Sequence, residues 1–197
     1  MNLMEKQNKK QVTFAFIDAS NIIYGARAEG WFIDQKKLIV YLKNKFQVKK
    51  AFFYYGKDSK DPKKEAFLSK LRQFGFILRI KEIKRFGKKT KANCDVDLTM
   101  DMLLKINEYN RAIVLSGDGD FFPLLQYLQK QKKQLVVIAS PKRTAREIKQ
   151  FIGQRFINFG NLRYFLERKL VNKKGEDPEL GSFPGIMKKS VSKVNNF

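Results

Sequence analysis

The chain contains no histidine, and Cys94 is its only cysteine. These absences exclude a disulfide within the chain and a zinc site built from histidine and cysteine, and they leave no histidine to act as a general base. No apolar run approaches the roughly 20 residues that a membrane helix needs. Residues 1–10, MNLMEKQNKK, are polar and basic, unlike a secretory signal. We therefore expect a cytoplasmic protein that does not insert into membranes.

Acidic residues are also scarce, because 41 Lys and Arg face only 19 Asp and Glu and give a formal net charge of +22. Such a field attracts polyanions and accelerates encounter with them. A genome-wide composition bias is the alternative explanation, but the placement of the cations is uneven. Residues 79–91, RIKEIKRFGKKTK, hold seven cations and one acid. We expect this segment to bind nucleic acid backbone through Lys84, Arg85, Lys88, Lys89 and Lys91.

The composition predicts one folded domain with short extensions. A hydrophobic fraction of 43% and 18 phenylalanines exclude wholesale disorder, and 197 residues are enough to bury a full core. We expect a basic N-terminal extension over 1–10, a single domain over 11–170 and a flexible basic tail over 171–197, where Lys, Gly, Pro, Ser and Asn predominate.

Strand and helix patterns alternate along the domain. Short apolar runs predict strands at 12–17, 50–55, 76–81, 111–115, 134–139 and 155–159. Between and after them, amphipathic patterns predict helices after Asp34, from Asp61-Pro62 to Gly75, over 94–107, from Asp120 to about 130, over 141–152 and in 161–170. The 94–107 helix would carry Val96, Met100, Leu103 and Asn107 along one side. This alternation favours a three-layer α/β/α fold with a central parallel sheet.

Four aspartates stand at the ends of these elements. Asp18 follows the first strand, Asp118 and Asp120 follow the strand at 111–115, and Asp95 begins a helix. In open parallel sheets, functional groups collect at the carboxyl ends of strands where the strand order reverses. An all-oxygen cluster at that edge would select Mg²⁺ or Mn²⁺, and the bound ion would let like charges remain ionised together.

Three segments carry a resemblance to a known family: residues 16–21 (FIDASN), 91–101 (KANCDVDLTMD) and 115–124 (LSGDGDFFPL). They resemble, in order, the aspartate motifs of NYN domains of the LabA-like group, which belong to the PIN-like nuclease superfamily. The resemblance covers about residues 10–160. It implies a PIN-like sheet in the order 3-2-1-4-5, with Mg²⁺- or Mn²⁺-dependent cleavage of RNA, and we expect endonuclease action on single strands.

The resemblance also implies roles for particular residues. Asp18, Asp95, Asp118 and Asp120 match the acidic cluster that holds metal, and Asn21 matches the polar residue that helps to hold the cluster. Asp101 matches a further aspartate that supports the site or binds a basic neighbour, and Ser116 would hydrogen-bond a carboxylate, a phosphate or its own turn. The chain departs from the pattern before Asp95, where Ala92-Asn93-Cys94 replaces a glycine that many members have.

Simpler readings stay open at this stage. Asp120 alone could cap a helix that begins at Phe121, and Asp118 alone could form a turn. Asp97 is expected on a solvated face and Cys94 in packing. An RNA-binding adaptor with a weak or inactive site is the main alternative function, and a phosphatase or phosphotransferase is the second. The latter lacks support, because no Asp-x-Asp follows the first strand and no P-loop is present. The oligomeric state is open, with a homodimer as one option.

Overall fold

The computed structural model describes residues 11–57, 62–82, 84–86, 89–91 and 94–169. Within them, six parallel strands form one sheet in the order β3-β2-β1-β6-β7-β8. The strands are β1 (Thr13–Asp18), β2 (Val48–Lys57), β3 (Ile77–Glu82), β6 (Arg111–Leu115), β7 (Gln134–Ala139) and β8 (Phe156–Asn158). Counted along the sheet alone, the order is 3-2-1-4-5-6. The expected parallel sheet is confirmed, and the strand at 155–159 extends it beyond β7.

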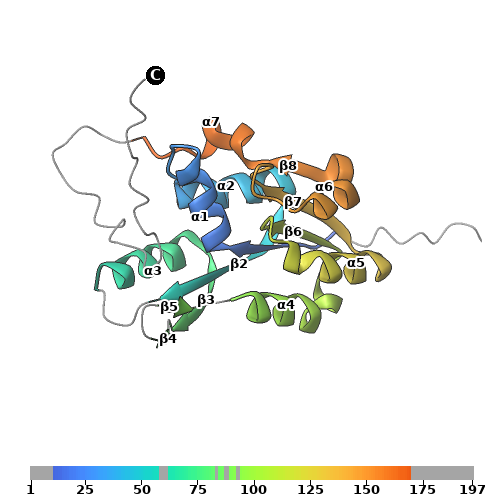
Figure 1. Cartoon of the computed structure of the whole chain (residues 1–197), viewed down its shortest axis with the longest axis horizontal. Helices are drawn as coiled ribbons and strands as arrows, with labels where there is room; N and C mark the ends of the chain where they lie inside the picture. Colours follow the sequence, from blue (N-terminus) through green and yellow to red (C-terminus); the bar gives the residue numbers. More distant parts are fainter. Residues whose placement is uncertain (1–10, 58–61, 83, 87–88, 92–93, 170–197) are drawn as a thin grey trace, which may run out of the picture.

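Helices cover both faces of the sheet, so the fold has three layers (Figure 1). The cluster of buried side chains on one face includes residues of α1 (Ala19–Ala28), α2 (Gln35–Phe46), α3 (Pro62–Phe74) and α7 (Arg163–Leu166). The cluster on the other face includes residues of α4 (Asp95–Leu104), α5 (Phe122–Lys130) and α6 (Arg146–Ile152). Short 3-10 helices lie at η1 (Ile106–Glu108), η2 (Gly119–Phe121), η3 (Gly153–Arg155) and η4 (Phe159–Leu162).

The strand β1 occupies the centre of this core. All six of its residues are buried, and alternate side chains enter the two clusters because successive strand residues point to opposite faces. Phe14 and Phe16 pack with Phe52 and Tyr109 on the α4 and α5 side, and the rings of Phe16 and Phe52 stack with centroids 5.4 Å apart. A strand buried on both faces fixes the position of whatever follows its last residue.

Two helices differ from their sequence-based predictions. No element was predicted over 19–28, where α1 forms directly from the end of β1, because Asp18 is both the last strand residue and the N-cap of the helix. The helix predicted over 141–152 begins only at Arg146. Thr144 donates its hydroxyl proton to the Ser140 carbonyl at 2.7 Å, and this contact holds residues 140–144 as a turn.

The face of α4 was also predicted wrongly. Val96 and Met100 are 65% and 47% exposed, whereas Leu98 and Met102 enter the core beside a buried Asp101. The predicted helix over 94–107 ends at Leu104, and a 3-10 turn follows. Two sides of α4 could face the core: the apolar side with Val96 and Met100, and a mixed side that includes Asp101. The mixed side is buried because its aspartate finds cationic and hydroxyl partners beneath it.

The basic segment forms a separate antiparallel ribbon of β4 (Lys84–Phe86) and β5 (Lys89–Lys91), in which Lys84 lies opposite Lys91. Three residues, 92–94, separate Lys91 from Asp95, the first residue of α4. The ribbon therefore connects the edge strand β3 to one of the predicted site residues. Lys88 lies outside the described residues, as do 1–10 and 170–197. The predicted extensions therefore remain predictions.

Among the residues that the structure describes, no helix combines the length and the apolar composition needed to cross a bilayer.

Candidate functional site

Strand order reverses between β1 and β6, which are hydrogen-bonded neighbours with Ile17 opposite Leu115. From β1 the chain proceeds outward to β2 and β3, and from β6 it proceeds the other way to β7 and β8. The start of α1, after β1, and the loop after β6 therefore lie side by side at the carboxyl edge. This is the position at which open α/β sheets place their functional groups, and it brings the first and third sequence motifs together as predicted.

Asp18 is held firmly at this edge. Its Oδ1 accepts hydrogen bonds from the Ser20 hydroxyl at 2.7 Å and from the Asn21 backbone N–H at 3.2 Å. Its Oδ2 accepts from the Ser116 hydroxyl at 3.2 Å. Asp18 is buried and caps α1, and its two oxygens have donors both in the first turn of α1 and in the loop after β6. The sequence analysis did not predict a role for Ser20. Its only signal in the sequence is a hydroxyl group two residues after an aspartate that caps a helix.

Asn21 and Ser116 join the start of α1 to the loop after β6. The Asn21 side-chain oxygen accepts from the Gly117 N–H at 3.2 Å, and the Ser116 hydroxyl oxygen accepts from the Asp118 N–H at 3.3 Å. These bonds fix the loop after β6 relative to the start of α1. Ser116 thus has the carboxylate contact that was one of its predicted roles, and Asn21 holds the site through the backbone.

Gly117 permits a close approach that no other residue would allow. A Cβ on Gly117 would collide with the Thr144 side chain and lie 3.0 Å from the Thr144 Cα. The Ala145 N–H also donates to the Gly117 carbonyl at 3.1 Å. The turn before α6 therefore packs against the loop that carries Asp118. No pattern in the sequence predicted this contact of Thr144.

Three carboxylates converge beside this loop. One oxygen from each of Asp95, Asp118 and Asp120 can be chosen so that all three lie within 4.8 Å of one another. Asp95 comes from the first turn of α4, where the helix dipole favours a negative charge. Asp118 caps η2 by accepting from the Asp120 N–H at 3.1 Å, and Asp120 is exposed. Asp118 therefore has the turn role that was its simpler explanation, but its carboxylate also joins the cluster.

The donor set of this cluster fits a hard divalent cation. It consists of carboxylate oxygens alone, which Mg²⁺ and Mn²⁺ prefer, and it leaves room for water ligands because Asp120 is exposed. Neither Asp118 nor Asp120 forms an ion pair with another residue that the structure describes. Asp18 does not join these three oxygens. It is connected to Asp118 through Ser116, so any contact of Asp18 with the same ion remains a prediction.

The electrostatics around Cys94 reflect the density of acid here. Burial raises the pKa of the Cys94 thiol to about 11, and the negative charges of Asp97, Asp18 and Asp95 add to that increase while Lys81 opposes it. A thiol with this pKa is neutral near pH 7 and is a poor nucleophile. Cys94 packs against the core cluster under α4, which confirms its predicted packing role.

Asp101 and Asp97 lie in different surroundings. Asp101 accepts from Arg79 Nε and Lys105 Nζ at 2.6 Å each and from the Tyr54 hydroxyl at 3.0 Å. Of its two predicted roles, the structure supports binding of basic neighbours. Asp97 is exposed and pairs with Lys81 at 2.9 Å, in agreement with a solvated face.

Glu147 is a carboxylate that the sequence analysis missed. Its Oε1 lies 3.2 Å from the point where a Cβ on Gly119 would stand, so its side chain reaches the loop between Asp118 and Asp120. The signal in the sequence was weak, because Glu147 is an ordinary acidic residue in the first turn of α6.

Comparison with known proteins agrees with this geometry. The model of the NYN domain family matches residues 13–160. A curated relative, the low amplitude and bright protein LabA of Synechococcus elongatus, is 27% identical over 161 residues, which are 78% of this chain and 86% of LabA. A crystal structure of a Vibrio parahaemolyticus protein of unknown function superposes with a TM-score of 0.69 at 26% identity, covering 81% of this chain and 99% of that one.

Proposed function

Because the chain belongs to the NYN domain family, a family of PIN-like nucleases, we propose that it is a metal-dependent ribonuclease. The reaction is hydrolysis of RNA phosphodiester bonds at the acidic cluster, with endonucleolytic cleavage of single strands as the expected mode. The observation that carries the proposal is the convergence of Asp95, Asp118 and Asp120 at the point where strand order reverses.

In this proposal Asp95, Asp118 and Asp120 hold Mg²⁺ or Mn²⁺. When bound, the ion would supply charge neutralisation at the scissile phosphate and lower the pKa of a bound water. Asp18, Asn21 and Ser116 hold the start of α1 and the loop after β6 together through the hydrogen bonds described above. Asp120, the exposed member, orients the attacking water or a second ion. The chain has no histidine, so a carboxylate of the cluster would assist as the general base.

The basic surface supports RNA as the substrate. A net charge of +22 favours a polyanion, and the β4–β5 ribbon brings Lys84, Arg85, Lys89 and Lys91 into the segment that precedes Asp95. We propose that this ribbon, together with Lys88, binds the RNA backbone. Phosphate contacts of this kind position a strand without reading its sequence.

The decisive experiment compares two aspartate variants in an assay on single-stranded RNA with added Mn²⁺ or Mg²⁺. Asp118→Asn should abolish cleavage and keep the fold, because an asparagine oxygen can still accept from the Asp120 N–H. Asp97→Asn is the matched control, since it removes a nearby exposed carboxylate outside the cluster, and it should cleave like the wild type. Equal cleavage by all three proteins would identify a contaminant and favour the adaptor function.

The metal assignment has its own test. Crystals soaked in Mn²⁺ should give an anomalous peak beside Asp95, Asp118 and Asp120, with Asp18 either in contact or separated by one water. A peak at another place, with these carboxylates farther than one water from it, contradicts the assignment.

The ribbon assignment is tested by salt dependence. Neutralising Lys84, Arg85, Lys88 and Lys89 together should weaken RNA binding and reduce the slope of log affinity against log salt by roughly 0.7 per lost phosphate contact on a single strand. An unchanged slope would assign these cations to solubility alone.

A further inference from the structure

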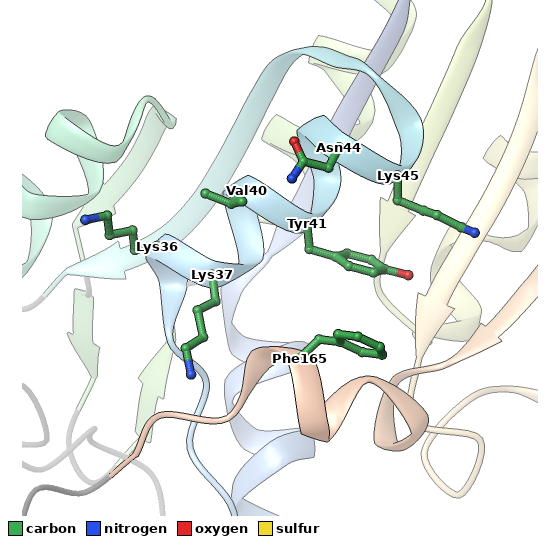
Figure 2. A pocket seen from close by; sticks show the side chains of 7 residues that line it. All are labelled: Lys36, Lys37, Val40, Tyr41, Asn44, Lys45 and Phe165. Atoms are coloured by element: carbon green, nitrogen blue, oxygen red, sulfur yellow. The ribbon is translucent and has the colours of Figure 1, made fainter.

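A groove of about 700 Å³ lies on the outer surface of α2, beside α7 (Figure 2). It is lined by Lys36, Lys37, Val40, Tyr41, Asn44, Lys45 and Phe165. All but Phe165 belong to α2, whose opposite face enters the core through Leu38, Leu42 and Phe46. The groove is built from residues that the proposed cleavage site does not use.

Exposed apolar and aromatic groups form the centre of the groove. Val40 is 48% exposed and Phe165 is 57% exposed. The rings of Tyr41 and Phe165 lie with centroids 6.3 Å apart and planes at 30°, and in Figure 2 both project into the same space. Tyr164, 89% exposed, stands edge-on to Phe165 at 5.4 Å. Three aromatic rings at one exposed position are unusual on a surface that serves only for solubility.

Cations flank these rings at both ends. The helix α2 contains four lysines and no acidic residue, and no carboxylate lines the groove. Lys37 Nζ donates to the Glu167 carbonyl at 2.7 Å, while Lys36 and Lys45 have no carboxylate partner among the described residues. Lys36 and Lys45 are nine residues apart, roughly 13 Å along a helix. Figure 2 places Tyr41 and Phe165 between them.

We propose that this groove is a second binding site for single-stranded RNA, in which bases stack on Phe165 and Tyr41 and phosphates meet Lys36 and Lys45. The positive charge of the groove disfavours a cationic occupant, and an unpaired lysine on each side of exposed rings suits a ligand that alternates aromatic faces with negative charges. Aromatic platforms with flanking cations bind single strands irrespective of sequence. The inference rests on the proposed function for its choice of RNA, and it adds a place where the strand is held away from the acidic cluster.

Fluorescence anisotropy with a labelled uridine 12-mer, full-length protein and EDTA tests the site without cleavage. Phe165→Leu keeps apolar bulk but removes the stacking face, and it should weaken binding by about 5-fold or more, whereas Phe165→Tyr should restore it. The double variant Lys36→Gln, Lys45→Gln should lower the slope of log affinity against log salt by roughly 1.4.

The matched controls are Tyr127→Leu and the double variant Lys130→Gln, Lys142→Gln. They alter exposed residues elsewhere and should change affinity less than the groove variants do.

Crosslinking identifies the contact directly. A 12-mer containing 4-thiouridine should crosslink to peptides that contain Tyr41 or Phe165. Crosslinks confined to other peptides, with wild-type affinity in both groove variants, would overturn the inference. Binding of an acidic aromatic peptide in the groove without displacement of the RNA would overturn it as well, in favour of a protein partner. If the groove binds RNA but the protein never cleaves it, the proposed function fails and this inference stands. If cleavage depends on Asp118 while the groove variants bind normally, only this inference fails.

Discussion

Helix α4 carries two aspartates whose surroundings contrast. Asp95, at its start, joins Asp118 and Asp120 in a cluster of like charges. Asp101, less than two turns later, is buried and bonded to Arg79, Lys105 and Tyr54. Both match aspartates in one sequence motif. The two differ in their neighbours, because Asp101 accepts from two cations and a hydroxyl, whereas Asp95 lies beside two further carboxylates.

The contrast separates a structural acid from a functional one. A buried carboxylate with two cationic partners and a hydroxyl donor is satisfied, so it contributes to stability and has little capacity left for a ligand. Three carboxylates whose oxygens lie within 4.8 Å of one another repel each other, and a cation that joins them relieves that repulsion. Their mutual repulsion makes a cation favourable at the cluster, which is the reason for placing the metal at Asp95 rather than at Asp101.

The largest expected effect is on cleavage. Asp95→Asn should reduce Mn²⁺-dependent cleavage of RNA on the order of 100-fold or more, because loss of a metal ligand exceeds the 10- to 100-fold cost of losing a group behind one. Asp101→Asn, assayed at a temperature where it is fully folded, should stay within a few-fold of the wild type. Comparable losses in both variants would show that the two aspartates belong to one site and would remove the contrast.

Metal binding should stabilise the protein through the cluster alone. With Mn²⁺ at 100 times its dissociation constant, the free energy of unfolding should rise by about 2.7 kcal/mol in the wild type and in Asp101→Asn. The rise should vanish in Asp118→Asn, whose metal-free stability should equal or slightly exceed that of the wild type because repulsion is relieved. Thermal melts with and without Mn²⁺ measure both. A rise that survives Asp118→Asn places the ion elsewhere.

Without metal, the ranking of the variants should reverse. Asp101→Asn should lower the free energy of unfolding by about 1–3 kcal/mol, because two charge-assisted hydrogen bonds are weakened. The lower part of that range is expected, since the Arg79 side chain is 40% exposed and its ion pair is screened by water. Urea unfolding of Asp101→Asn and Asp118→Asn in EDTA compares them directly. Greater destabilisation by Asp118→Asn would make Asp118 a structural turn residue.

Much of the fold could be predicted from the sequence because local patterns agreed with tertiary packing. The strand at 134–139 was predicted with its observed bounds, and Asp34 caps α2 by accepting from the Lys37 N–H at 3.0 Å, as its position before an amphipathic run implied. The α1 helix was missed because no loop separates it from β1. The face of α4 was wrong because the pattern alone cannot reveal that Arg79 and Lys105 would make a buried aspartate favourable.

The candidate site was predictable only to the level of its motifs. Adjacent strands at a reversal of strand order place Asp18 and Asp118 at one edge, which spacing and topology rules could anticipate. Asp18 caps α1 through the Asn21 N–H, and its remaining hydrogen bonds depend on Ser20 and Ser116 having suitable positions in three dimensions. The contacts of Thr144 and Glu147 with the Gly117 to Gly119 loop come from residues about 30 positions away, and no local pattern marks them.

The smallest expected effect is on the pH dependence of stability. Burial tends to raise the pKa of Asp101, but hydrogen bonds from Arg79, Lys105 and Tyr54 outweigh it and hold the pKa below its ordinary value of 3.8. A carboxyl group whose folded pKa is depressed contributes stability that is present above the unfolded pKa and is lost as pH falls through the folded pKa. The difference in unfolding free energy between the wild type and Asp101→Asn should therefore be constant from pH 8 to about pH 5 and should shrink below about pH 4. Urea titrations of both proteins at each pH, in EDTA, measure that difference. A difference that persists unchanged in acid would mean that the charge of Asp101 contributes nothing, and the contrast between the two aspartates of α4 would then rest on the metal cluster alone.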